Sequence, residues 1–219
     1  MGMYSFITTG NIMNKEFCFD KLVYELDKFD FDTFNASPID FYAVVTNVET
    51  GKAEHIKITD SRKQLEVLRA SGSMPFVSKI VEIDGAKYLD GAISDSIPLQ
   101  KALDEGYGKI IVVQTRPESY LKHRECLPYN WVYRKYPNFV KCANRQFEMY
   151  NATLELVKKC EEQGRIIVLR PSQNLKIARV EKNLDKLKAI YNLGISDCTS
   201  KLDEIKKYLE QEKSEKVTL

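Results

Sequence analysis

Asp90 is the residue of this sequence whose type and setting best suit acid–base chemistry. It follows the short strand-like stretch Lys87-Tyr88-Leu89 and precedes Gly91, which permits a tight backbone path. A carboxylate beside a glycine at a strand end faces a crevice rather than the core, where it could orient or deprotonate a hydroxyl group. The alternative is an Asx-turn, in which the Asp90 carboxylate caps its own backbone. The spacing alone leaves both roles open.

Hydrophobic patterning predicts the elements that must position Asp90. An Asp-Gly pair at 84–85 between short apolar stretches predicts a hairpin that ends at Asp90, and residues 41–58 predict another. The apolar runs at 109–113 and 165–169 are typical of strands buried on both faces in a parallel sheet, and a helix at 138–163 would join them as a βαβ unit. Further helices are predicted at 14–29, 61–70, 96–105 (capped by Ser96), 181–192 and 196–212. The expected fold class is α/β, with residues 1–219 forming one domain.

Three consecutive motifs frame Asp90. They are Ser-x-x-x-Pro-Phe at 71–76, Ile-Asp-Gly-x-x-Tyr-Leu-Asp-Gly-Ala at 83–92 and Asp-Ser-Ile-Pro at 95–98. This block resembles the second half of a bacterial patatin-like phospholipase, and the similarity runs from about residue 14 to 195. The resemblance implies a three-layer α/β/α fold that is truncated here at its N-terminus.

The resemblance also implies a chemistry. The family hydrolyses acyl esters of lipids with a Ser–Asp dyad and no histidine, and its Asp-Gly-Gly/Ala motif falls on Asp90, Gly91 and Ala92. Asp90 would activate or hold the serine hydroxyl, an acyl-enzyme would form, and water would release it. Supporting positions near the dyad are Ser71, Ser73 and Pro75. No cofactor or metal is implied.

The sequence departs from the family in one respect. Gly-x-Ser-x-Gly, the motif that would carry the nucleophile, occurs nowhere in the 219 residues, and no glycine-rich oxyanion loop precedes a first buried strand. Ser71 and Ser73 lack the strand-to-helix elbow of a nucleophile, and their small size suits close packing. We therefore expect the chain to be part of a longer hydrolase and to be inactive alone. Without early strands the sheet would keep an open edge, which predicts a homo-oligomer.

Composition limits the partners. Thirty-three basic and 31 acidic residues give a net charge of +2, which offers no field for nucleic acid, and no apolar run is long enough to span a bilayer. Five cysteines without a C-x-x-C pair, together with the lack of a signal peptide, indicate a reducing, cytoplasmic setting. The expected substrate is a lipid or acyl ester, and transient contact with a membrane surface stays open.

A second class of function competes with the enzyme. Residues 116–137 form an aromatic-rich segment that is either a surface loop pinned over the core or a ligand site at the carboxyl end of a parallel strand. With such a segment the chain could be a non-catalytic module that binds lipid or a partner. His55 is expected to be structural and His123 to lie at the surface, and residues 210–219 form a charged tail.

Overall fold

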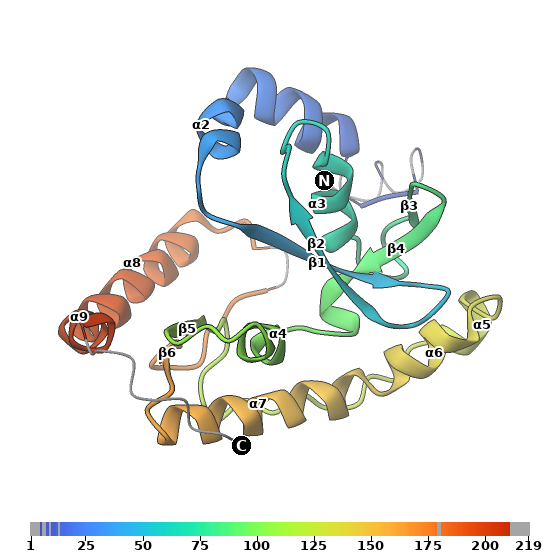
Figure 1. Cartoon of the computed structure of the whole chain (residues 1–219). Helices are drawn as coiled ribbons and strands as arrows, with labels where there is room; N and C mark the ends of the chain where they lie inside the picture. The colour runs from blue at the N-terminus through green and yellow to red at the C-terminus, as the bar shows by residue number, and fades with distance from the viewer. Residues whose placement is uncertain (1–4, 6–7, 9, 13, 179–180, 211–219) are drawn as a thin grey trace. The chain divides into compact units, whose positions relative to one another are not determined.

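The computed structural model describes residues 5, 8, 10–12, 14–178 and 181–210. They form two compact units, one within Met1–Ile97 and His123–Tyr150 and the other within Pro98–Lys122 and Asn151–Leu219. The sequence was expected to form one domain, and no linker composition marks this division. The mixture of helices and strands confirms the α/β class (Figure 1).

Most elements of the first unit come from the N-terminal half of the chain. They are η1 (Phe17–Leu26), α2 (Phe31–Ala36), β1 (Phe41–Asn47), β2 (Ala53–Ile58), α3 (Leu65–Ser71), β3 (Val81–Ile83), β4 (Ala86–Asp90), η2 (Gly91–Ile93), α5 (Tyr129–Val132) and α6 (Pro137–Asn144). Helix α7 (Gln146–Glu162) begins in this range and continues into the second unit. The second unit otherwise contains α4 (Leu99–Asp104), β5 (Ile110–Val113), β6 (Ile166–Leu169), α8 (Leu184–Ser200) and α9 (Leu202–Glu210).

The first unit is built on an antiparallel sheet of order β2-β1-β4-β3. Both predicted hairpins are present, and the turn between β3 and β4 places Asp84 and Gly85 at φ of 49° and 79°, as a two-residue hairpin turn requires. Because side chains alternate along β4, Tyr88 joins a core cluster with α3 while Leu89 joins one with α5 and α6. Helices therefore cover both faces of the sheet that ends at Asp90.

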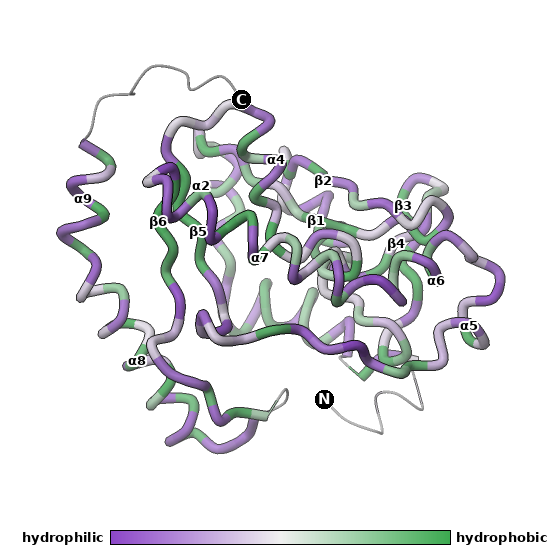
Figure 2. The backbone as a smooth tube through the Cα atoms, turned by 90° about the horizontal axis from the view of Figure 1, so that it is seen from below, coloured by the Kyte–Doolittle hydropathy of each residue, from purple (hydrophilic) through white to green (hydrophobic). Residues whose placement is uncertain are grey.

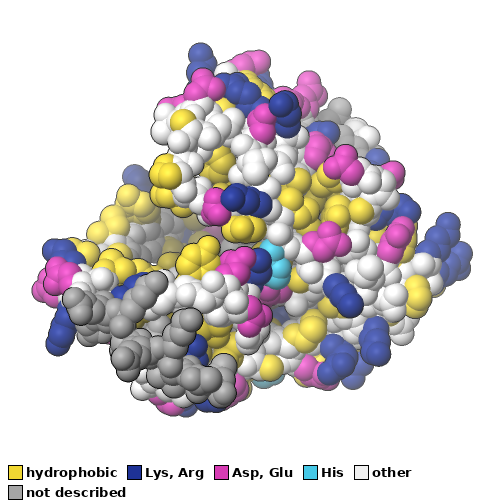
Figure 3. Space-filling model, in the orientation of Figure 1, with side chains coloured by type: hydrophobic (Ala, Val, Ile, Leu, Met, Phe, Trp, Pro, Cys, Tyr) yellow, Lys and Arg dark blue, Asp and Glu magenta, His cyan; other side chains and the backbone are white. Residues whose placement is uncertain are grey.

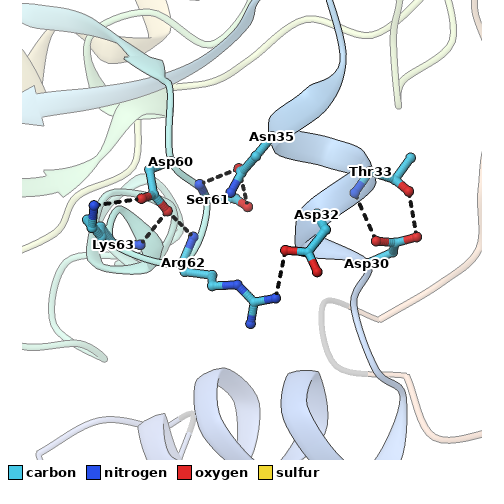
Figure 4. Close-up of polar contacts among 8 residues, drawn as sticks. All are labelled: Asp30, Asp32, Thr33, Asn35, Asp60, Ser61, Arg62 and Lys63. Carbon is cyan, nitrogen blue, oxygen red and sulfur yellow. Dashed lines mark hydrogen bonds and ion pairs between the residues drawn. The ribbon is translucent and has the colours of Figure 1, made fainter.

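Short polar contacts join α2 to the turn that leads into α3 (Figure 4). Asp30 caps α2 by accepting hydrogen bonds from the Thr33 N–H and hydroxyl, and these bonds lower the pKa of its carboxyl group. The Asn35 Oδ1 accepts from the N–H and the hydroxyl of Ser61, a side chain that is 1% exposed. The helix expected from residue 61 begins only at Leu65, because Asp60 caps a turn before it.

Other predicted helices differ in their bounds. The expected 14–29 helix runs over Phe17–Leu26 with the wider i→i−5 hydrogen bonds of a π-helix, and the Asn14 side chain accepts from the Phe17 N–H before it. The expected 138–163 helix is broken at Arg145 into α6 and α7. Ser96 does not cap α4, because its hydroxyl donates to the Ala92 carbonyl.

The second unit holds the predicted parallel pair, in which Ile110 lies opposite Ile166 and Val113 opposite Leu169. Both strands are continuously hydrophobic (Figure 2). Residues 166–168 are buried as expected, whereas burial of β5 on both faces was not found, because the Val113 side chain is 72% exposed. From α9, the Tyr208 hydroxyl accepts from the Ile110 N–H and donates to the Arg165 carbonyl, which joins the starts of both strands.

The C-terminal helices differ from the two predicted. A single α8 extends through Gly194 to Ser200, and α9 follows after Lys201. Hydrophobic and hydrophilic residues alternate along both (Figure 2), and hydrophobic side chains lie at the surface over α8 (Figure 3). The predicted tail, 210–219, lies outside the described residues beyond Glu210. Among the described residues, no helix combines the length and apolar character needed to cross a membrane.

Candidate active site

The backbone of Asp90 is fixed from two directions at the end of β4. Its N–H donates to the Ser73 carbonyl at 2.9 Å, and its carbonyl accepts from the Thr46 hydroxyl at 2.7 Å. One carboxylate oxygen accepts from the Ala92 N–H at 2.8 Å and so caps the short η2 turn. The Asp90 carboxylate thus makes the Asx-type bond that was considered as the alternative role, and the residue is half-buried at the end of β4.

The turn after Asp90 lies directly against β1. A Cβ added to Gly91 would lie 2.1 Å from the Val44 carbonyl oxygen, so this position admits only glycine. The carbonyl of Ala92 accepts from Ser96 and from the Gln146 side chain, each at 2.7 Å. The turn is therefore held by tertiary contacts and not only by its own hydrogen bonds.

Two polar pairs that the sequence did not single out complete this support. Thr46 is fully buried, and its single hydroxyl proton goes to Asp90, so the Ser94 hydroxyl donates to Thr46 at 2.8 Å. His55 Nε2 lies 2.8 Å from Asp95 Oδ2, and both side chains are about one fifth exposed. His55 thus contributes to positioning the turn.

Among the predicted support residues, Ser73 contacts Asp90 through its backbone carbonyl. Ser73 is 4% exposed, and its hydroxyl donates to the Arg69 carbonyl at 2.7 Å at the end of α3. Ser71 is the last residue of α3 and is half-buried, while Pro75 is buried. In this arrangement the Ser73 hydroxyl serves the end of α3 and not the Asp90 carboxylate.

Comparison with known proteins shows which family the region around this site resembles. Residues 2–103, which include the whole Asp90 turn, match the family model described as patatin-like phospholipase. This part of the chain is similar to patatin-like phospholipases, and residues 2–103 are called the patatin-like segment below. Residues 136–210 match a domain of unknown function, DUF6363. The uncharacterized protein YjjU of Escherichia coli (strain K12) is 43% identical over 54 residues, which are 24% of this chain and only 15% of that relative.

The patatin-like segment ends at residue 103, so it covers less of the chain than the resemblance over about residues 14 to 195 suggested. It contains every residue to which the sequence assigned a part in the site, from Ser71 to Ala92. Strand β6 and the C-terminal helices α8 and α9 lie in the region that matches the domain of unknown function.

An aromatic cluster packs beside the patatin-like segment in the same unit. Tyr129 and Tyr133, from the predicted 116–137 loop, are buried and contact Phe76, whose backbone has a φ of 68°. The Tyr133 hydroxyl accepts from the Phe76 N–H at 3.0 Å, which fixes this uncommon conformation. Burial raises the pKa of Tyr133, an effect that this bond partly offsets. These aromatic residues serve as core, while Trp131 and His123 are exposed.

The chemistry available here is that of one positioned carboxylate. Burial raises the pKa of the nearby Cys142 thiol to about 11, so this thiol stays protonated at neutral pH and is no nucleophile. In the part of the chain that the structure describes, no three His, Cys, Asp or Glu side chains gather as metal ligands would. A carboxylate held in this way can orient or deprotonate a hydroxyl group that is brought to it.

Proposed function

We propose that this chain supplies the aspartate of a Ser–Asp dyad, Asp90, to a serine acyl hydrolase of lipid esters. The nucleophilic serine would come from residues outside the 219, since the sequence holds no Gly-x-Ser-x-Gly. The hydrolase would act on a phospholipid, lysophospholipid or simpler ester. The described cysteines are all free, which suits a reducing, cytoplasmic setting.

The observation that carries this proposal is the set of contacts that hold the Asp-Gly-Ala turn within the patatin-like segment. Asp90 is fixed through both its N–H and its carbonyl, and Gly91 contacts Val44 too closely for any other residue. A catalytic carboxylate must be held in one place if it is to act on a hydroxyl, because misplacement by about 1 Å costs roughly 100-fold in rate. Such support suits a catalytic position.

The proposal is tested by ester hydrolysis. A short-chain p-nitrophenyl ester assay and fluorophosphonate labelling are applied to residues 1–219 and to a form extended by the residues encoded upstream. We expect no turnover from 1–219 and both turnover and labelling from the extended form. Asp90→Asn in the extended form should lower turnover by roughly 100-fold or more, because it keeps the oxygen that accepts from Ala92 but removes the charge.

Asp84→Asn is the matched control. Asp84 lies in the β3–β4 turn with a φ of 49°, a conformation that asparagine tolerates, so activity should be unchanged. Turnover by 1–219 that survives Asp90→Ala would contradict the proposal, and so would full activity of the extended Asp90→Asn form.

A second function is favoured by the bond between the Asp90 carboxylate and the Ala92 N–H. That bond gives the carboxylate a structural task without catalysis. The chain would then be a non-catalytic α/β module that binds lipid or a partner. A stop codon directly upstream of Met1 in the genomic sequence would favour this module, whereas an in-frame Gly-x-Ser-x-Gly would favour the enzyme.

A further inference from the structure

A cavity of about 300 Å³ lies in the second unit at the carboxyl ends of the parallel strands. Val113 and Leu169, the last residues of β5 and β6, form one wall, and Ile190 and Leu193 from α8 form the opposite wall. These four side chains make the cavity mainly apolar. Its size is at the lower end of the range for small-molecule sites in proteins. It contains none of the residues of the Asp90 site.

Gln114 lines this cavity directly after the end of β5. Its backbone N–H donates to the Leu169 carbonyl at 2.8 Å. This bond extends the hydrogen bonding between β5 and β6 by one residue and fixes the position of the Gln114 backbone. The side-chain Nε2 is buried and has no hydrogen-bond partner among the described residues. A buried amide without a partner costs about 1–3 kcal/mol of stability. A ligand that brings an acceptor to Gln114 would remove this cost.

The charged groups in the wall already have partners. Arg170, whose side chain is 14% exposed, pairs with Glu161 and lies 3.4 Å from Glu118. The Asp197 carboxylate accepts from the Ser172 N–H at 3.0 Å. An anion that entered the cavity would therefore meet Arg170, whose charge is already balanced, and the negatively charged carboxylate of Asp197. The electrostatics favour an uncharged ligand.

We propose that this cavity binds a neutral aliphatic carbonyl compound, such as a medium-chain acyl ester or ketone, whose carbonyl oxygen accepts from Gln114 Nε2. At roughly 30 Å³ for each water-sized group, the cavity holds about ten non-hydrogen atoms. The apolar walls take the chain, and Gln114 selects the carbonyl. The proposal does not rest on Asp90 or on hydrolysis, and it assigns a ligand to a region that overlaps the match of unknown function.

The test uses 2-nonanone, a ketone of matching size that cannot be hydrolysed. The full chain is labelled with ¹³C, and methyl NMR follows the signals of Ile190 and Leu193 during titration. We expect saturable shifts at these methyl groups and no comparable response to octanoate, which carries a charge. Gln114→Leu should weaken binding of 2-nonanone about 5- to 10-fold, because the hydrogen bond is lost while the apolar walls remain.

Gly194 supplies a blocking variant and its control. It lines the cavity within α8, and an added Cβ would meet no atom within 4 Å. Gly194→Phe should abolish the shifts by filling the space, while Gly194→Ala should keep them. In the absence of ligand, Gln114→Leu should raise Tm, because it removes an unpaired buried amide.

Three results would overturn the proposal: no shifts at millimolar 2-nonanone, equal affinity of Gln114→Leu and the parent chain, or octanoate binding as tightly as the ketone. A fall in Tm for Gln114→Leu would also contradict it, because that fall would mean the amide already has a partner. Since no ester is cleaved in this experiment, its outcome is independent of the hydrolase assay.

Discussion

Gly91 is required by a close approach between backbones, not by an unusual backbone angle. It lies in the η2 turn and is not among the glycines with positive φ. An added Cβ would come within 2.1 Å of the Val44 carbonyl oxygen and 2.5 Å of its carbonyl carbon. Since Val44 belongs to the central strand β1, it cannot move aside without disturbing the ladder to β2. The turn that carries Asp90 thus depends on the absence of one methyl group.

Gly91→Ala should therefore destabilise the chain by about 2–3 kcal/mol, the upper part of the range for overpacked sites. The free energy of unfolding, from urea denaturation followed by circular dichroism, measures the effect. Gly194→Ala is the control, because its Cβ meets no atom within 4 Å and alanine is the better helix former by about 1 kcal/mol. Equal stabilities of the two variants would show that the Val44 contact is absent in solution.

The sequence could indicate Asp90 and Gly91 because they belong to one contiguous motif. It could not indicate the partners that hold them. Thr46 lies 44 residues from Asp90, and His55 lies 40 residues from Asp95. A threonine in a β-branched run and a histidine in a hairpin strand have no local feature that distinguishes a support role from an ordinary one. Only the pairing of β1 with β2 and β4 brings them to the turn.

At the scale of elements, α2 and α3 are coupled through a single side chain. The Asn35 Oδ1 accepts from the Ser61 N–H at 2.9 Å and from its hydroxyl at 2.8 Å (Figure 4). Asn35→Ala would leave both donors of the buried Ser61 without this acceptor, so we expect a loss of about 1–3 kcal/mol in the free energy of unfolding. Denaturation by urea, with thermal denaturation as a second measurement, determines this loss in the free energy of unfolding.

Asp32→Asn is the matched control for that variant. Asp32 also bridges the two elements, through Arg62 at 3.0 Å, but its side chain is 88% exposed. Exposed ion pairs contribute little because water screens them. A loss as large for Asp32→Asn as for Asn35→Ala would show that charge and not the buried acceptor joins the elements.

Elements with local signals could be predicted, and those set by tertiary contacts could not. The Asp84-Gly85 turn and the apolar strands β5 and β6 follow from residue types within a few positions. The break at Arg145 has no glycine or proline to mark it. Ser96 has the right type for a helix cap, but its hydroxyl bonds to Ala92 in the folded chain. Where a side chain had two possible hydrogen-bond partners, the sequence did not decide between them.

At the scale of the whole molecule, the chain passes between its two units three times, after Ile97, Lys122 and Tyr150. None of these crossings carries the proline- or glycine-rich composition of a linker, and the last falls within α7. The unit boundaries also do not coincide with the two matched regions, 2–103 and 136–210. The sequence predicted a single domain because nothing along it marks a change of unit.

The second unit leaves its parallel sheet small and partly uncovered. Within the described residues, β5 and β6 pair only with each other. Ile111 and Val113 share one face of β5, and their side chains are 39% and 72% exposed. Parallel strands are found almost only in larger sheets with both faces covered, and unpaired edges recruit strands from other chains. We therefore expect this chain to self-associate through the β5–β6 sheet.

Light scattering coupled to size-exclusion chromatography tests this expectation at micromolar concentrations. The chain should elute with a mass above its 25.3 kDa, and Ile111→Lys should shift it toward the monomer, because a charge on β5 opposes strand pairing. Ile39→Lys is the control, since it adds the same charge at a residue that is 79% exposed in the first unit and should leave the mass unchanged. A compact monomer at every concentration would rule out association through this edge. Equal effects of the two lysines would instead attribute it to net charge.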